Sequence, residues 1–567
     1  KKMTTKVSEI KSVTESAEVF GGIDRSNGTP LGYWQELVGM DFTAYPALRT
    51  CKPFSYKELP DGITGYMFKN GKIVYTKADG IYIDGKKTGI ELSTGEKQLV
   101  GMGAYILILP DEALINTADD PISVTFPTRH KLDGSLFEYN QNQTRPSVSI
   151  FKRLYIDVAK DSAELSYYND GDQVRIAYSY GGKKKYLTAK IKSISEESYT
   201  SSGCVSVNLD TSLYNDTHYF YTEGRRMESF RVVCIKNAVI SKPFPAMDFV
   251  VEHNNRLWGC SSGNHEIYCS KLGSAVEWGN YDGISTDAWA ATIGSDGDFT
   301  GACVYADSVL FFKENCVHIV YGTKASNFTV STIRLRGVQK ESGGSLCISG
   351  GLLYYKAPEG VYCFNGSAAQ RIDSKLGGDI SETAVMTADG RYIVMAASDG
   401  TVYFYDKRYS AWYERRLDNV CSAHEINGRL YAVTKDGNGK MNLVRLVGTE
   451  DDFKMQSENS FEAVSGNIGR GKVYGIYKKL RAYMLHGGNV GKATEISIYV
   501  SSERGEWKKA FVSDGTETDS EKIITAPMIP LRCRTLKIKI SGKVSNETYL
   551  LLYGIYLDSE KGSEIGG

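Results

Sequence analysis

The chain has 567 residues, in which 67 lysines and arginines balance 67 aspartates and glutamates, so that its formal net charge at pH 7 is zero. This balance argues against a protein that grips nucleic acid or anionic membrane through a broad basic face, because such proteins carry a large positive excess. Tyrosine (38 residues) and glycine (58 residues) are abundant, a composition that favours short strands joined by tight turns and hence an all-β fold.

The first 30 residues are polar and are predicted to form an N-terminal arm. No apolar stretch follows the basic N-terminal residues, so no secretory signal is expected. No run in the chain approaches the roughly 18 apolar residues of a membrane helix, and we expect a soluble protein without a membrane span. The best helix candidate is a short segment over residues 33–40.

A repeated unit runs through residues 31–117 and 239–454. Each copy is a short apolar strand, a polar turn, a strand rich in leucine, isoleucine, valine and tyrosine, a second turn and a strand that ends in aromatic residues. We count seven copies, at residues 65–86, 98–117, 250–271, 302–322, 346–366, 385–406 and 423–446. A period of roughly 40 to 50 residues with about four short strands is typical of a β-propeller. The sequence therefore predicts a propeller of six to eight blades, the first in 31–117 and the remainder in 239–454.

The first turn of several copies carries the dipeptides that two-residue hairpins need. Asn70-Gly71, Asp389-Gly390 and Asn427-Gly428 each stand between runs of alternating apolar residues. Asparagine, aspartate and glycine tolerate the positive φ that both central residues of a type I′ turn require. We therefore predict type I′ hairpins at these three places.

The repeat is interrupted at residues 118–238. Strand-like runs cover residues 174–178, 186–191 and 205–209, with polar turns between them, and indicate a small inserted β-barrel. A propeller tolerates such an insertion because a loop between its strands leaves the core untouched. The basic run Lys183, Lys184 and Lys185 falls in a turn of this insertion. A solvated hairpin tip is the simpler interpretation, and contact with phosphate is the alternative.

The spacing changes again after residue 454. Strand-like runs over residues 496–500, 536–540 and 549–556 are separated by long polar loops and suggest a C-terminal β-sandwich over 455–567. This region carries the aromatic residues Tyr499, Trp507 and Tyr549. They could stack on a sugar or pack in a core.

No catalytic, cofactor or metal site is predicted. Ser262–His265 spells SGNH in what is expected to be one hairpin turn, and no carboxylate pair or metal-ligand spacing stands out. His253 and His424 take similar positions just before the first turn of two repeats, which indicates packing. The eleven scattered cysteines, with no CxxC, indicate reduced core residues. We expect a protein that is not an enzyme, and a propeller hydrolase or lyase is the disfavoured alternative.

Several stretches resemble a family of tailed-bacteriophage virion proteins known as stabilisation, nozzle or tail-hub proteins. The likeness is carried by GMDFTAYPALRTCKPF at 39–54, GIYIDGKKTG at 80–89, GEKQLVGMGAYILILPD at 95–111 and the segments 247–273 and 297–322. It extends from about residue 30 to the predicted sandwich, and no catalytic motif contributes to it. The resemblance implies a β-propeller with inserted and appended β-domains. It also implies a ring, typically of six copies, below the portal and adaptor of the virion.

From the resemblance we expect a structural virion protein of the phage neck or tail, made in the host cytoplasm: a nozzle, stopper or stabilisation ring. Such a homo-hexamer would retain packaged DNA and form its exit channel. Its partners would be the portal, the adaptor and other tail proteins, including tail fibres, together with transient contact with double-stranded DNA. Zero net charge suits a DNA channel. Every phosphate that a lysine or arginine neutralises adds affinity for DNA, whereas the genome must slide past without being held. Lys183, Lys184 and Lys185 are the candidate lumen contacts. The alternative is a receptor- or carbohydrate-binding tail protein that acts through the C-terminal sandwich.

Overall fold

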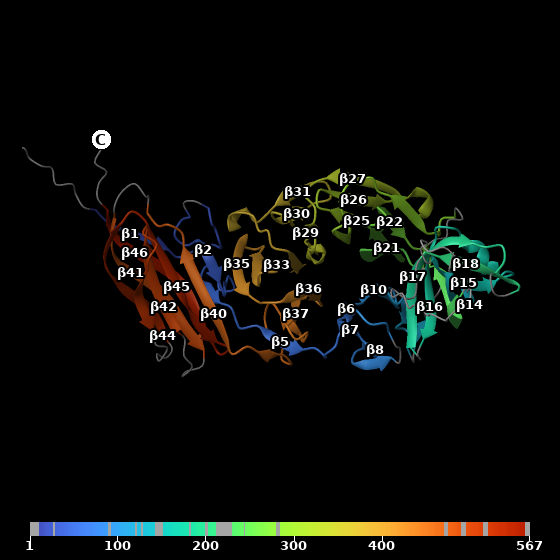
Figure 1. Ribbon diagram of the computed structural model, residues 1–567. Coiled ribbons are helices and arrows are strands. Elements are labelled where there is room, and N and C mark those ends of the chain that lie inside the picture. The colour runs from blue at the N-terminus through green and yellow to red at the C-terminus, as the bar shows by residue number, and fades with distance from the viewer. Residues whose placement is uncertain are drawn as a thin grey trace, which may run out of the picture.

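The computed structural model consists of mainly antiparallel β-sheets with almost no helix (Figure 1). It describes residues 11–26, 29–88, 92–119, 122–125, 129–141, 151–180, 183–198, 202–210, 230–242, 244–278, 284–469, 475–488, 495–513 and 520–561. Within these ranges, helical structure is limited to single 3₁₀ turns at Ala163–Tyr167, Ala325–Asn327, Gly343–Ser345 and Ser374–Leu376. The all-β prediction is confirmed. No helix of the described ranges is long and apolar enough to cross a membrane.

The sequence repeats fold into small antiparallel sheets, each made of successive hairpins. Five have four strands: β6–β9 (Gly65–Lys69, Lys72–Lys77, Gly80–Ile83, Lys86–Thr88), β10–β13 (Gln98–Met102, Tyr105–Leu109, Ala113–Asn116, Ser123–Thr125), β20–β23 (Phe249–His253, Arg256–Ser261, Glu266–Cys269, Trp289–Thr292), β24–β27 (Gly301–Tyr305, Ser308–Lys313, Cys316–Tyr321, Thr329–Arg334) and β28–β31 (Cys347–Ser349, Leu352–Ala357, Gly360–Phe364, Ala369–Arg371).

Two further repeats recruit strands from elsewhere. β32–β35 (Ala384–Ala388, Tyr392–Ala397, Thr401–Asp406, Ala411–Arg416) begin a nine-stranded sheet. β36–β38 (Val420–Ile426, Arg429–Lys435, Met441–Arg445) pair with β5 (Ser55–Glu58), which precedes all the other repeats in the chain and also pairs with β39 (Lys454–Met455).

A hydrophobic cluster lies between each sheet and the next. One joins β6–β9 to β10–β13, and others follow in order to β28–β31 and onward to β32–β35. A last cluster, which includes Val433 and Met441 with Tyr66 and Phe68 packed against it, joins β36–β38 back to β6–β9. Because each sheet is covered on both faces, β33 is buried at all of its positions. The sheets therefore form a closed, propeller-like array.

Two of the three predicted type I′ turns have the required backbone. Asn70 and Gly71 have φ values of 51° and 75°, as do Asn427 and Gly428. The prediction is wrong at Asp389, where three residues connect β32 to β33 and neither Asp389 nor Gly390 has a positive φ. The Asp389 carboxylate accepts hydrogen bonds from the amides of Arg391 (2.7 Å) and Tyr392 (2.6 Å) and so stabilises a longer turn.

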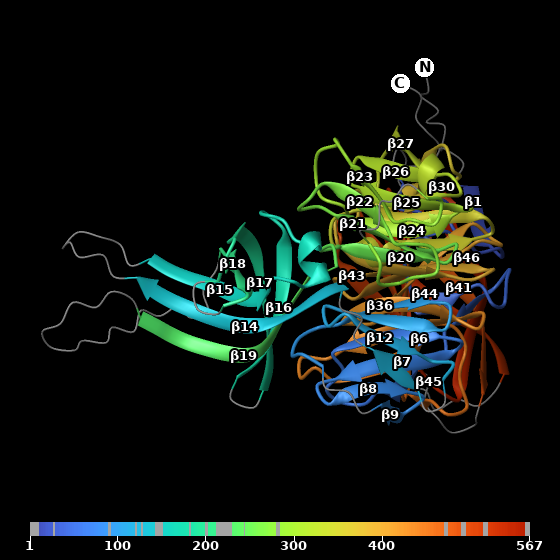
Figure 2. The same cartoon turned by 90° about the vertical axis from the view of Figure 1, so that its right-hand side faces the viewer.

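A closed barrel is inserted between β13 and β20, as predicted, and projects from the side of the array (Figure 2). Its strands are β14 (Arg129–Gln141), β15 (Phe151–Ala159), β16 (Gln173–Tyr180), β17 (Lys183–Ile194), β18 (Cys204–Leu209) and β19 (Phe230–Lys242). It has its own core, which includes Leu136, Ile156 and Val207. Arg175 anchors it through a hydrogen bond to the Pro110 carbonyl (2.9 Å) and an ion pair with Glu112 (3.3 Å).

The C-terminal strands form two sheets that share one core with the neighbouring repeats. The nine-stranded sheet continues from β35 through β2 (Trp34–Val38) to β40 (Glu458–Ser465), β45 (Leu536–Ser545), β42 (Glu495–Ser502) and β43 (Trp507–Ser513). The other contains β3 (Met40–Asp41), β4 (Leu48–Thr50), β46 (Thr548–Lys561), β41 (Gly475–Gly488), β44 (Ser520–Cys533) and β1 (Lys11–Ala17), which pairs with β46.

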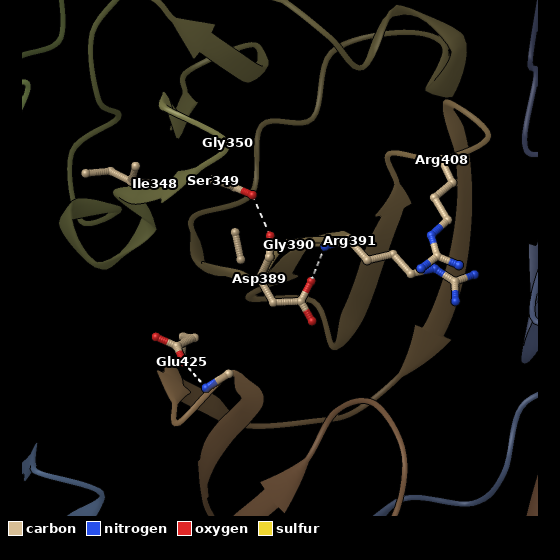
Figure 3. Close-up of a pocket in the computed structure, with 10 residues that line it drawn as sticks. Ile348, Ser349, Gly350, Asp389, Gly390, Arg391, Arg408 and Glu425 are labelled. Carbon is tan, nitrogen blue, oxygen red and sulfur yellow. Dashed lines mark hydrogen bonds between the residues drawn. The ribbon is translucent and has the colours of Figure 1, made fainter.

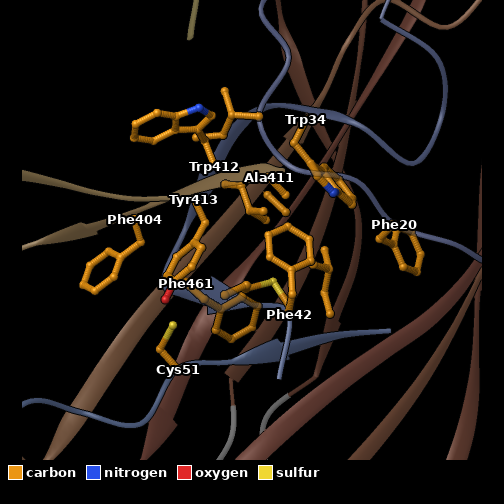
Figure 4. Close-up of a cluster of buried hydrophobic side chains, with 14 of the residues drawn as sticks. Phe20, Trp34, Phe42, Cys51, Phe404, Ala411, Trp412, Tyr413 and Phe461 are labelled. Atoms are coloured by element: carbon orange, nitrogen blue, oxygen red, sulfur yellow. The ribbon is translucent and has the colours of Figure 1, made fainter. Parts of the chain in front are cut away.

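The N-terminal segment therefore joins the C-terminal sheets and begins no repeat before β5. Residues 1–10 of the predicted arm lie outside the described residues. The predicted helix over 33–40 is wrong: β2 pairs with β40 through a register shift between Trp34 and Glu36. That irregularity places Trp34 and Leu37, three residues apart, on the buried side, where Trp34 lies against Phe20 (Figure 4). The spacing imitates a helix, although the backbone is extended.

Candidate functional site

The first turns of successive repeats contact one another. His253, before the β20–β21 turn, has its Nε2 3.5 Å from Asp307 of the β24–β25 turn. The Tyr305 hydroxyl donates to the Gly351 carbonyl in the β28–β29 turn (2.9 Å), and the Ser349 hydroxyl donates to the Asp389 carbonyl in the β32–β33 turn (2.5 Å). Turns far apart in sequence therefore meet on one face of the array.

His424 lies at the seam where the array closes. Its ring centroid is 4.8 Å from that of Phe68 on β6, and its Nε2 is 2.8 Å from the Ser422 hydroxyl. The Tyr66 hydroxyl is 2.5 Å from the same Ser422 hydroxyl. Burial lowers the pKa of His424 to about 4, so the ring is neutral at pH 7. These contacts fit the predicted packing role, and no group of three metal-ligating side chains occurs among the described residues.

A cleft of about 540 Å³ opens between the turns of three consecutive repeats (Figure 3). The β28–β29, β32–β33, β34–β35 and β36–β37 turns supply its walls. The lining residues are Ile348, Ser349, Gly350, Ala388, Asp389, Gly390, Arg391, Arg408, Glu425 and Gly428. Its volume lies within the roughly 300–1,000 Å³ range of ligand pockets. We refer to it below as the inter-repeat cleft.

The charged groups of the inter-repeat cleft differ in how they are paired. Arg391 forms two hydrogen bonds with the fully buried Asp406 carboxylate (2.9 and 2.5 Å). The Glu425 carboxylate accepts a hydrogen bond from the Gly428 amide. Arg408 is exposed, and within the described ranges no side chain pairs with its guanidinium. In the view of Figure 3, both arginine side chains lie on the side of the cleft opposite Ile348.

Sequence reasoning missed this cleft because its charged residues come from separate repeats, and Arg391 and Arg408 form no local motif. A signal was nevertheless present. Once the repeats are aligned, Gly350, Asp389 and Asn427 are equivalent first turns. Equivalent turns of neighbouring propeller blades lie on one face, so charged residues that flank them are candidates for a shared site.

The candidate DNA contacts lie at the start of β17. Tyr180 pairs with Lys183 and Tyr178 with Lys185 in the β16–β17 hairpin. The Lys185 side chain is exposed, as expected for a hairpin tip, whereas the side chains of Lys183 and Lys184 lie outside the described part of the structure. No inter-repeat cleft residue belongs to this barrel, and contact with DNA stays a prediction.

The structure brings together two of the three candidate sugar-stacking residues. Tyr499 on β42 and Trp507 on β43 flank Lys539, whose Nζ is 5.3 Å and 5.1 Å from their respective ring centroids. Trp507 remains 38% exposed. Tyr549 lies on β46 in the other sheet, where the Arg49 guanidinium covers its ring at 4.4 Å. Of the three residues, only Tyr499 and Trp507 therefore lie close enough to contact the same sugar.

The remaining motifs have structural explanations. Ser262–His265 forms the turn between β21 and β22, and the Ser262 hydroxyl accepts a hydrogen bond from the Phe299 amide (2.9 Å). The cysteines whose side chains the structure describes are free thiols. Burial raises the pKa of Cys269 and Cys347 to about 12, which keeps both protonated at neutral pH.

No protein-family model and no curated protein matches the chain. Among solved structures, BamB from Moraxella catarrhalis is 11% identical, with a TM-score of 0.32, and the match covers 69% of this chain and 100% of that one. Sqt1 from Saccharomyces cerevisiae is 10% identical, with a TM-score of 0.33 and coverage of 70% and 100%. A sialidase from Trypanosoma rangeli is 9% identical, with a TM-score of 0.22 and coverage of 97% and 96%.

Proposed function

We propose that this chain is a non-catalytic structural protein of a phage virion. In this proposal, copies of it form a ring in the neck or tail that retains packaged DNA and gives the DNA an exit channel. The proposal starts from the resemblance of residues 39–54, 80–89, 95–111, 247–273 and 297–322 to the nozzle and stabilisation proteins. The array with its projecting barrel is the kind of rigid subunit that such a ring requires.

We further propose that the array is a seven-bladed propeller and that the two C-terminal sheets form a β-sandwich. The seven sheets that carry the repeats support this blade count, with β5 completing the last blade from the N-terminal side. Leu480 on β41 and Leu552 on β46 share a fully buried cluster with Ile498 on β42 and Ile540 on β45. A core shared between the two sheets is the defining feature of a sandwich.

The observation that carries the structural proposal is the continuous joint between the array and the C-terminal sheets. β2 pairs with β35 on one side and with β40 on the other. Arg25 reinforces this joint by an ion pair with Glu414 on β35 (2.6 Å) and by hydrogen bonds to the carbonyls of Gln35 and Leu376. A subunit under the pressure of packaged DNA needs such stiffness, because flexible domains would let the channel wall yield.

Native mass spectrometry and electron microscopy of the purified chain and of particles test the proposal. A closed ring, with six copies expected from the resemblance, would support it. A chain that stays monomeric at high concentration and is absent from particles would overturn it.

Replacing Lys183, Lys184 and Lys185 together by glutamate separates ring formation from DNA contact. The lumen prediction expects assembled particles whose DNA ejection has lost part of its salt dependence, because phosphate contacts release counterions. Unchanged ejection in assembled particles would remove these lysines from the proposal without affecting the ring.

A second candidate function is carbohydrate binding at the C-terminal sheet. The exposed Trp507 beside Tyr499, with Lys539 between them, favours it, because aromatic faces stack on sugars and a cation can pair with an anionic group. A glycan array probed with the full chain and with Trp507→Ala tests it. Binding that the substitution abolishes would support this function, and absence of binding to neutral and anionic glycans would exclude it.

A further inference from the structure

We propose that the inter-repeat cleft is a docking site for an acidic segment of a protein partner. The segment would place a carboxylate beside Arg408 and an apolar side chain against Ile348. This proposal goes beyond ring formation and does not depend on it, since the cleft lies within one chain.

The first observation is an exposed guanidinium at the cleft, that of Arg408. Arg408 has no partner within the described ranges. Its neighbour Lys407 donates to the Ser349 hydroxyl and to the Asp389 carbonyl (3.3 Å), and no described carboxylate lies within ion-pair distance of its Nζ. Neither cation therefore has a carboxylate counter-ion among the described residues. The planar guanidinium of Arg408 can bind a carboxylate through two parallel hydrogen bonds.

The carboxylates of the cleft itself cannot supply that counter-ion in their present arrangement. Asp389 accepts the amides of Arg391 and Tyr392, and Glu425 accepts the amide of Gly428. Each stabilises the turn in which it lies, so moving it toward Arg408 would leave backbone amides without an acceptor. A carboxylate from outside the chain meets no such cost.

The second observation indicates a peptide as the source of the carboxylate. Ile348 in the cleft is 47% exposed and offers an apolar contact beside the charged groups. The turn that carries Arg408 also carries Tyr409, which is 36% exposed and stacks on Tyr45 at 4.2 Å. Arginine and tyrosine are both enriched at protein interfaces. A bare anion would make no use of these apolar groups.

The third observation is that Gly390 keeps the cleft open. Gly350 and Gly428, at neighbouring tips, have φ values of 61° and 75° and are needed for their turns. Gly390 lies outside the left-handed region, and a Cβ added to it would meet nothing within 4 Å. Its backbone therefore does not require glycine, and a larger side chain there would occupy the cleft without straining the turn.

Fluorescence anisotropy with the full chain tests the proposal. The probes are a set of short labelled peptides that combine leucine and glutamate at different spacings, each with a glutamine-for-glutamate and an alanine-for-leucine version. We expect at least one leucine–glutamate peptide to bind, and each of its altered versions to bind at least about tenfold more weakly, a loss of about 1.4 kcal/mol.

Two variants locate the binding. Arg408→Glu reverses the charge, and Gly390→Leu fills the cleft; each is expected to weaken binding by about tenfold or more. Gly437→Leu is the matched control, because Gly437 lies in the β37–β38 turn, has no positive φ and would likewise meet nothing within 4 Å. It should leave binding unchanged. Equal melting temperatures establish that the variants fold. If Arg408→Glu does not fold, Arg408→Lys replaces it; this variant keeps the charge but loses the planar guanidinium.

Three results would overturn the proposal. In the first, no peptide of the set binds. In the second, the peptides bind Gly390→Leu and Arg408→Glu as tightly as they bind the original chain. In the third, inorganic phosphate or a short DNA duplex binds and is lost in both variants, whereas the peptides do not bind. The cleft would then be an anion site of another class.

Discussion

Protonation of His424 should open the seam that closes the array. The folded chain holds the pKa of this histidine at about 4, against an ordinary value of 6.5, because burial disfavours the imidazolium. Above pH 6.5 the ring is neutral in both the folded and unfolded states, so it contributes no pH dependence. As the pH falls below 6.5, the unfolded state binds the proton more readily, and stability declines until the pH reaches about 4. The two pKa values give a loss of about 2 kcal/mol at pH 5.

Amide hydrogen exchange in β36 and β6, corrected for the intrinsic effect of pH, measures the opening free energy of this seam at pH 7.5 and pH 5. We expect His424→Phe to remove about 2 kcal/mol of the difference between the two pH values. Tyr66→Phe is the control: it loses the hydrogen bond to Ser422 and should cost about 1 kcal/mol at both pH values. A His424→Phe chain with an unchanged pH dependence would refute the reasoning, and so would a measured His424 pKa near 6.5.

Three further substitutions test the joints of the molecule. Arg25→Ala leaves Glu414, whose side chain is only 4% exposed, without its partner, and should lower the free energy of unfolding in urea by about 3 kcal/mol. Adding Glu414→Gln to the same chain should restore part of this stability, and an unchanged unfolding midpoint in Arg25→Ala would contradict the role of the ion pair. Gly39→Ala should destabilise by at least about 1 kcal/mol, since φ is 68° and the added Cβ would lie 2.3 Å from the Ser460 carbonyl oxygen; equal melting temperatures would count against it. Arg175→Ala should leave the barrel folded but make the 110–112 segment more sensitive to proteolysis, and unchanged cleavage rates would show that other contacts hold the barrel.

Local features of the fold could be predicted from the sequence because they depend on neighbouring residues. Asn70-Gly71 and Asn427-Gly428 adopt the backbone that their composition favours. The repeats fall on the sheets for the same reason: strand, turn and strand are contiguous in each copy. Asp389 shows the limit of such rules, since the same dipeptide pattern forms a longer turn once its carboxylate caps the backbone.

Features that depend on distant pairing could not be predicted in this way. β1 is polar, and its partner β46 lies more than 500 residues away in the chain, so nothing local marks it as a strand. The irregular pairing of Trp34 produces a helical spacing in an extended segment. The inter-repeat cleft likewise depends on contacts among turns of separate repeats. Its key residue, Arg408, stands out only because no side chain in the described part of the chain pairs with its guanidinium.

The rotational symmetry and position of this chain in an intact particle test the central proposal most directly. Electron microscopy of purified virions would measure both at once. We predict a closed ring of six copies around a central channel at the neck or tail, with the same chain contacts repeated between neighbours. Single copies at fibre tips, or particles that lack the chain altogether, would contradict the proposal.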